Sequence, residues 1–85
     1  VVTGSNWNNA NIGFRSIAFG GNTVASGISA FAHGWNSKAT NTYAIALGRN
    51  NTASAWCAVS LGDTTTASAS WSLAGGYLSV ASGQN

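Results

Sequence analysis

The sequence predicts an all-β fold, a solenoid whose fourteen-residue coils stack in parallel. Two repeated residues set this period: a glycine returns every fourteen residues, and an alanine stands five residues after each glycine. A third observation is the alternation of large and small residues before each glycine, which is typical of a strand. The repeat residues are Gly20, Gly34, Gly48, Gly62 and Gly76, with Ala25, Ala39, Ala53, Ala67 and Ala81.

The first expected strand of each coil is the apolar-rich segment that precedes the glycine. Its large residue always takes the same repeat position, with a small Ser or Ala on either side. We expect the large side chains to fill the roll interior, the small ones to form a flat outer face, and the glycine to turn the chain sharply. A helix is a poor fit, because the regular glycines and the Ser, Thr and Asn clusters would break it. The large residues are Ile17, Phe31, Ile45, Val59 and Leu73.

The second expected strand is short, as in "TVASG" and "NTASA", and contains the repeat alanine. Its alternation points each alanine inward, opposite the large residues of the first strand. Two strands and two turns fit into fourteen residues only if the chain coils, and the coils then stack about 4.8 Å apart. The expected product is a β-solenoid of flattened cross-section.

The repeat divides the chain into two parts. Residues 15–85 follow the period, and we expect them to form about five coils that belong to a longer chain. Residues 1–14 follow it poorly, because Asn6 and Asn11 stand where glycine and alanine should be. We expect this first part to be a degenerate coil or a junction.

The composition argues against most kinds of chemistry. Only 5% of the residues are charged and Asp63 is the single acid, so hydrolysis by two positioned carboxylates is unsupported. One histidine, His33, and one cysteine, Cys57, cannot supply the three or four ligands of a metal site within one chain. The glycines lack the Lys-Ser/Thr pair of a phosphate-binding loop. We therefore expect no enzymatic activity, no cofactor and no metal.

Charge and hydropathy also limit the partners. The three basic residues are scattered, so we expect no nucleic-acid partner. No apolar run reaches the ~20 residues of a membrane span, so we expect no membrane insertion by this segment. His33 is expected inside the roll or in a turn, although threefold symmetry could instead bring three copies together around an ion. Cys57 is expected to be a free thiol, and its role stays open.

Aromatic and charged residues at turn positions are the best candidates for recognition. Turns of a solenoid project outward, and exposed Trp and Tyr side chains can stack on sugar rings or anchor a protein partner. Packing against a neighbouring chain is the alternative role for the same side chains. The candidates for ligand contact are Trp35, Arg49, Trp56 and Tyr77.

A roll this thin is expected to need neighbouring chains. Ordering each residue costs about 1–2 kcal/mol of backbone entropy, and a narrow interior buries little apolar surface to offset that cost. A homotrimer, in which the flat Ser/Ala face of every chain surrounds a common axis, is a closed solution.

The runs "NTYAIALGRNNTASAW" and "GGYLSVASGQN" resemble the fourteen-residue head repeats of trimeric autotransporter adhesins, the YadA-like head. The resemblance covers about residues 15–85. It implies a left-handed parallel β-roll, assembled as a parallel homotrimer and displayed on the bacterial outer-membrane surface. The implied function is non-enzymatic attachment to host cells, matrix or glycans, through a host surface protein or glycan receptor. Similar repeats occur in tail fibres of phages and contractile injection systems, so a receptor-binding or passive spacer segment of such a fibre is the alternative.

Overall fold

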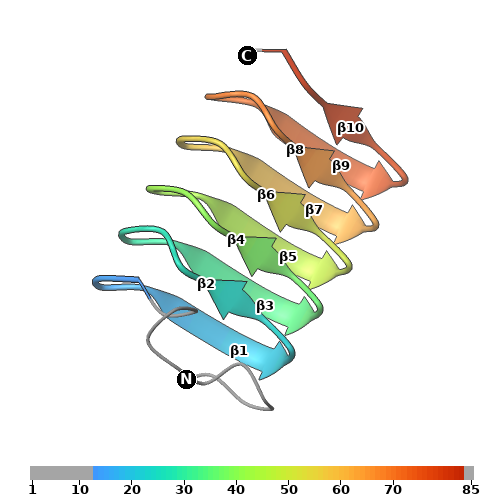
Figure 1. Ribbon diagram of the computed structural model, residues 1–85. Coiled ribbons are helices and arrows are strands. Elements are labelled where there is room, and N and C mark those ends of the chain that lie inside the picture. The colour runs from blue at the N-terminus through green and yellow to red at the C-terminus, as the bar shows by residue number, and fades with distance from the viewer. Residues whose placement is uncertain (1–12, 84–85) are drawn as a thin grey trace.

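The structure, a computed structural model, describes residues 13–83 (Figure 1). Within this range the chain forms a stack of coils without a helix, and each coil has one five-residue strand and one two-residue strand. The long strands are β1 (Ile17–Gly21), β3 (Phe31–Trp35), β5 (Ile45–Arg49), β7 (Val59–Asp63) and β9 (Leu73–Tyr77). The short strands are β2 (Val24–Ala25), β4 (Lys38–Ala39), β6 (Thr52–Ala53), β8 (Thr66–Ala67) and β10 (Val80–Ala81).

The strands form two parallel sheets, one of long strands in the order β1-β3-β5-β7-β9 and one of short strands in the order β2-β4-β6-β8-β10. Each residue pairs with the residue one period later, as Gly20 with Gly34 and Ala25 with Ala39. This register confirms the all-β parallel solenoid with fourteen-residue coils. The predicted junction or degenerate coil at residues 1–14 falls almost wholly outside the described residues.

The solenoid is a thin slab, with principal extents of 31, 22 and 13 Å. Its interior holds small side chains from both sheets, mostly alanine. The repeat alanines of the short strands, from Ala25 to Ala67, are fully buried, while Ala81 in the last coil is partly buried. The long strands contribute Ala18, Ala32, Ala46, Ser60 and Ala74, and the residues immediately before four of these strands contribute Ala30, Ala44, Ala58 and Ser72.

The expected interior position of the large residues is wrong. Ile17 is 47% exposed and Leu73 is 63% exposed, while Phe31, Ile45 and Val59 are half-buried on the outside of the long-strand sheet. The small residues on either side of them point inward instead. The alternation of large and small residues fits two assignments that differ by one residue, and such a shift exchanges the inward and outward faces of a strand. The structure has the assignment in which the small residues face inward. The physical reason is the short coil, because two sheets this close together leave room for Ala and Ser but not for Ile or Phe.

A column of buried polar side chains lies immediately before the short strands, at the repeat position of Asn51 and Thr65. Thr65 donates from its backbone N to Asn51 Oδ1 at 3.2 Å and from Oγ1 to the same oxygen at 2.9 Å. The Asn51 amide donates to the carbonyl oxygen of Leu47, and the Ser60 hydroxyl donates to the carbonyl oxygen of Thr65 at 3.0 Å. Buried polar groups are tolerated when they are bonded in this way.

The repeat glycines do not form the turns themselves. Each lies inside a long strand, one residue before its end, with a positive φ of 104–126°. A Cβ on Gly34 would lie 1.8 Å from the carbonyl oxygen of Gly48, so the stacked backbones approach too closely for a side chain. The sharp reversal follows two residues later, at Asn36 in the same coil, whose φ is 54°. The expectation that the glycines form the turns is therefore wrong, because the turn lies two residues after each glycine.

Candidate functional site

The outer side of the long-strand sheet is apolar. Two ladders run along it, and parallel in-register pairing places each residue directly on its repeat neighbour. The Phe19 ring meets the rings of Phe31 and His33 edge to face, at centroid distances of 6.3 and 5.9 Å. We call this surface the apolar face. It consists of Ile17, Phe31, Ile45, Val59 and Leu73, together with Phe19, His33, Leu47, Leu61 and Gly75.

The opposite side of the slab is polar in its middle coils. The short strands place Lys38, Thr52 and Thr66 on their outer side, between Val24 in the first coil and the exposed Val80 in the last. Thr40 and Ser54 are exposed immediately after two of these strands. We call this surface the polar face. The contrast matters because a contiguous apolar surface beside a hydroxyl-rich one marks the apolar side as an interaction surface.

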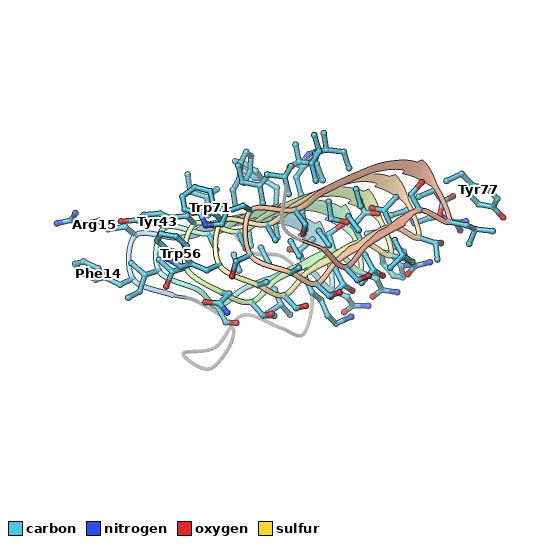
Figure 2. All side chains as sticks on the ribbon, turned by 90° about the horizontal axis from the view of Figure 1, so that it is seen from above. Phe14, Arg15, Tyr43, Trp56, Trp71 and Tyr77 are labelled. Carbon is cyan, nitrogen blue, oxygen red and sulfur yellow. The ribbon has the colours of Figure 1, made fainter. Side chains whose placement is uncertain are left out.

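The edge where the long strands begin carries an aromatic cluster. Tyr43, Trp56 and Trp71 lie together there, with centroid distances of 6.3 Å between the first two rings and 4.7 Å between the last two. All three side chains are 41–54% exposed. Figure 2 shows them along one narrow edge of the slab, with Phe14 and Arg15. We call this the start edge, and Cys57 lies on it as a half-buried free thiol.

The start edge tolerates bulky residues in an unfavourable backbone conformation. Tyr43 and Trp71 have φ values of 60° and 64°, where a side chain costs about 1–2 kcal/mol relative to the right-handed region. The equivalent turns at the other edge use Asn22, Asn36 and Asn50, and then Thr64 and Leu78, all with φ values of 54–58°. Both edges therefore accept large side chains at positive φ, and the turn geometry does not by itself select aromatic residues for the start edge.

The other edge, where the long strands end, holds a mixed ladder. Trp35, Arg49, Asp63 and Tyr77 stack at successive coils. Arg49 Nη2 donates to Asp63 Oδ2 at 3.0 Å and Nε donates to the same oxygen at 3.3 Å. This hydrogen bond, with a second from Thr64, holds the pKa of Asp63 below its ordinary value, and it raises the pKa of Arg49. We call this the end edge; Tyr77 marks it in Figure 2.

The structure divides the residues proposed for ligand contact between the two edges. Trp35, Arg49 and Tyr77 share the end edge, whereas Trp56 lies on the start edge with Tyr43 and Trp71. Tyr43 and Trp71 were not among the candidates; they share one repeat position, and Trp56 occupies the position immediately before it. Their signal in the sequence is a spacing of thirteen and then fifteen residues.

The described residues form no enclosed site. Among residues 13–83 there is no pocket, and no group of three or more His, Cys, Asp or Glu side chains comes together within the single chain. None of the described residues belongs to a helix that is long and apolar enough to cross a membrane.

A parallel β-solenoid with one apolar face and a polar back is a structural repeat domain. Its sequence matches the YadA head domain repeat (2 copies) over residues 12–37, 25–51 and 39–55, which together span just over half of the chain. The chain therefore belongs to the YadA head repeat family, a structural domain of the adhesin type. Comparisons with curated proteins and with solved structures give no match.

Proposed function

We propose that this chain is a head segment of a trimeric, non-enzymatic adhesin that is displayed on the bacterial outer-membrane surface. The apolar face is the observation that carries the proposal. It leaves Ile17, Phe19 and Leu73 substantially exposed in a single chain. Burying a side chain of this size contributes about 1.5–3 kcal/mol, so a single chain would lose that stabilisation along the whole face.

A parallel homotrimer would remove this surface from water. Heads of the YadA type generally form homotrimers. In a closed threefold assembly the same surface of every chain faces the axis. The apolar face takes that place in the proposed trimer, so the surface that packs is the ladder of large residues and not the Ser/Ala columns.

Attachment to host cells, matrix or glycans would then use the parts of the slab outside the axis. The end edge offers Trp35, Arg49 and Tyr77, and the start edge offers Trp56. Since no pocket exists among residues 13–83, each contact would be shallow, and repetition over three chains would supply avidity. A receptor-binding segment of a tail fibre would share the assembly and could use the same side chains, whereas a passive spacer would not need them for binding.

The assembly is tested by a matched pair of charges in one coil, introduced in the full-length protein. Ile45→Asp places a carboxylate on the apolar face, and Thr52→Asp places one on the polar face. We expect Ile45→Asp to abolish the trimer mass in analytical ultracentrifugation, because it would bury three carboxylates near the axis, whereas Thr52→Asp keeps that mass. A trimer that tolerates Ile45→Asp would contradict the proposed interface.

The attachment role needs a separate test with trimeric variants. One variant replaces Trp35, Arg49 and Tyr77 with alanine and so removes the candidate contact residues of the end edge. A second variant replaces Trp56 alone with alanine and so changes the start edge. We expect the first variant to lose most attachment to host cells and to immobilised glycans while the trimer mass is unchanged. Should both variants attach like the unmodified protein, the segment is a spacer.

A further inference from the structure

The apolar face contains one residue that its packing does not explain. His33 lies between Phe19 and Leu47 in the ladder, and every other side chain of the face within residues 13–83 is a hydrocarbon. Its ring is exposed and meets the Phe19 ring edge to face at 5.9 Å. Within the described residues it makes no hydrogen bond. The expectation of an interior or turn histidine is therefore wrong.

His33 also lies near the middle of the slab's broad side. It is the third of the five residues of β3, four residues after the start-edge turn at Ser29 and three before the end-edge turn at Asn36. When three flat slabs surround an axis with the same face inward, the middle of each face lies closest to that axis. His33 is therefore in the part of the apolar face that approaches the axis.

Threefold symmetry fixes the relative height of the three copies. A closed cyclic assembly relates its chains by rotation without translation along the axis, so three His33 side chains lie at one level. The neighbouring levels hold three Phe19 and three Leu47 side chains. The result is a ring of three imidazoles between two apolar layers.

Such a ring needs a partner for its nitrogen atoms. An imidazole nitrogen buried among hydrocarbon without a hydrogen bond is costly, and three such groups would lie in one apolar layer. Neutral imidazole is a ligand for zinc and for other late first-row divalent ions. Three histidine ligands with a water in the fourth position form a known zinc coordination. A bound ion would satisfy all three side chains together.

We propose that the three His33 side chains of the trimer form a binding site for a divalent transition-metal ion, with three imidazole ligands on the axis. This inference rests on the proposed homotrimer. The apolar face would then bind a metal ion as well as pack against its neighbours, and the stability of the trimer would depend on the metal concentration.

The test uses the full-length trimer after removal of metal with EDTA, with Zn²⁺ as the probe. Isothermal titration should give one ion per three chains, and Zn²⁺ should raise the thermal midpoint of the trimer. His33→Leu introduces the side chain of Leu47 and Leu61, so it should keep the trimer and lose both the binding and the thermal shift. Leu61→His places a second ring two coils away, about 10 Å along the axis, and should raise the stoichiometry to two ions.

The outcomes separate this inference from the proposed assembly. If ultracentrifugation shows no trimer, the proposed assembly fails, and the metal site fails with it. If the trimer is present but binds no Zn²⁺, or binds it equally well as His33→Leu, the metal site is wrong and the assembly stands. A His33→Leu trimer that is more stable than the unmodified trimer with Zn²⁺ would likewise show that His33 is merely a tolerated polar group in the interface.

Discussion

At the residue scale, the buried polar column shows how the same repeat position can have two different environments. Thr65 donates two hydrogen bonds to Asn51 and accepts one from Ser60, so its polar atoms are satisfied. The hydroxyl of Thr23, in the equivalent position, is buried without a hydrogen-bond partner. The two residues therefore allow a comparison between a buried threonine hydroxyl that has hydrogen-bond partners and one that has none.

Replacing each of these threonines with valine should have opposite effects. Thr65→Val leaves Asn51 Oδ1 with one donor fewer, so we expect a loss of about 1–3 kcal/mol in the free energy of unfolding. Thr23→Val removes an unsatisfied hydroxyl, so we expect no loss and a gain of up to about 1 kcal/mol. Urea unfolding of the two variants measures both changes. Equal losses would indicate that the column contributes through shape alone.

The Arg49–Asp63 pair gives a prediction about pH. Because the pKa of Asp63 is lowered in the folded protein, the pair contributes stability above the ordinary carboxyl pKa of 3.8 and loses it as the pH falls through the lowered value. The pair is on the surface, so the effect should be small and should diminish with added salt. Thermal unfolding below pH 4 should show a shallower pH dependence for Asp63→Asn than for the unmodified protein. Identical slopes would contradict this assignment.

At the element scale, much of the coil could be predicted from the sequence, but its orientation could not. The period, the two strands per coil and the parallel register follow from the glycine and alanine repeats, since identical positions must stack. The inward direction of Ile17 was wrong because a two-residue alternation fits either phase, and sheets usually bury their larger residues. The narrow spacing between the two sheets decides which residues face inward, and that spacing depends on how fourteen residues close into a coil.

The same limitation explains what was missed at the edges. The positions of Tyr43, Trp56 and Trp71 predict that all three lie around the second turn of a coil. The fourteen-residue period does not show that their rings are in contact, because Trp56 lies one repeat position away from the other two. His33 had an equally ambiguous position until the outward direction of its ladder was known.

The strand glycines give a sharp prediction about coil stacking. Gly34→Ala places a Cβ against the carbonyl of Gly48 at a φ of 116°, so we expect a loss of at least about 3 kcal/mol or failure to fold. Gly83→Ala is the control, because nothing lies within 4 Å of its added Cβ. We expect that change to stay within about 0.5 kcal/mol. Thermal unfolding compares the two, and a stable Gly34→Ala protein would contradict the close backbone approach.

At the scale of the whole molecule, the solenoid is a one-dimensional stack in which each coil contacts only its neighbours. Every ladder, on both faces and both edges, continues because residue i pairs with residue i + 14. Stability then depends on the interfaces between neighbouring coils and not on contacts between distant coils. Whole coils can therefore be added or removed, whereas an insertion or deletion that is not a multiple of fourteen residues would disrupt the pairing of the strands.

Deleting one coil should test this property. Removing residues 38–51 takes away fourteen residues and joins Ser37 to Thr52, so each remaining residue keeps its face and edge. We expect this variant to remain a trimer that is shorter by about 4.8 Å, with a modestly lower thermal midpoint because one repeat interface is lost. Removing only residues 45–51 shifts the following coils by half a period, which would bring turn residues opposite strands. That variant should not form a folded trimer in ultracentrifugation and circular dichroism, and two equally stable deletions would show that the fourteen-residue register does not hold the stack together.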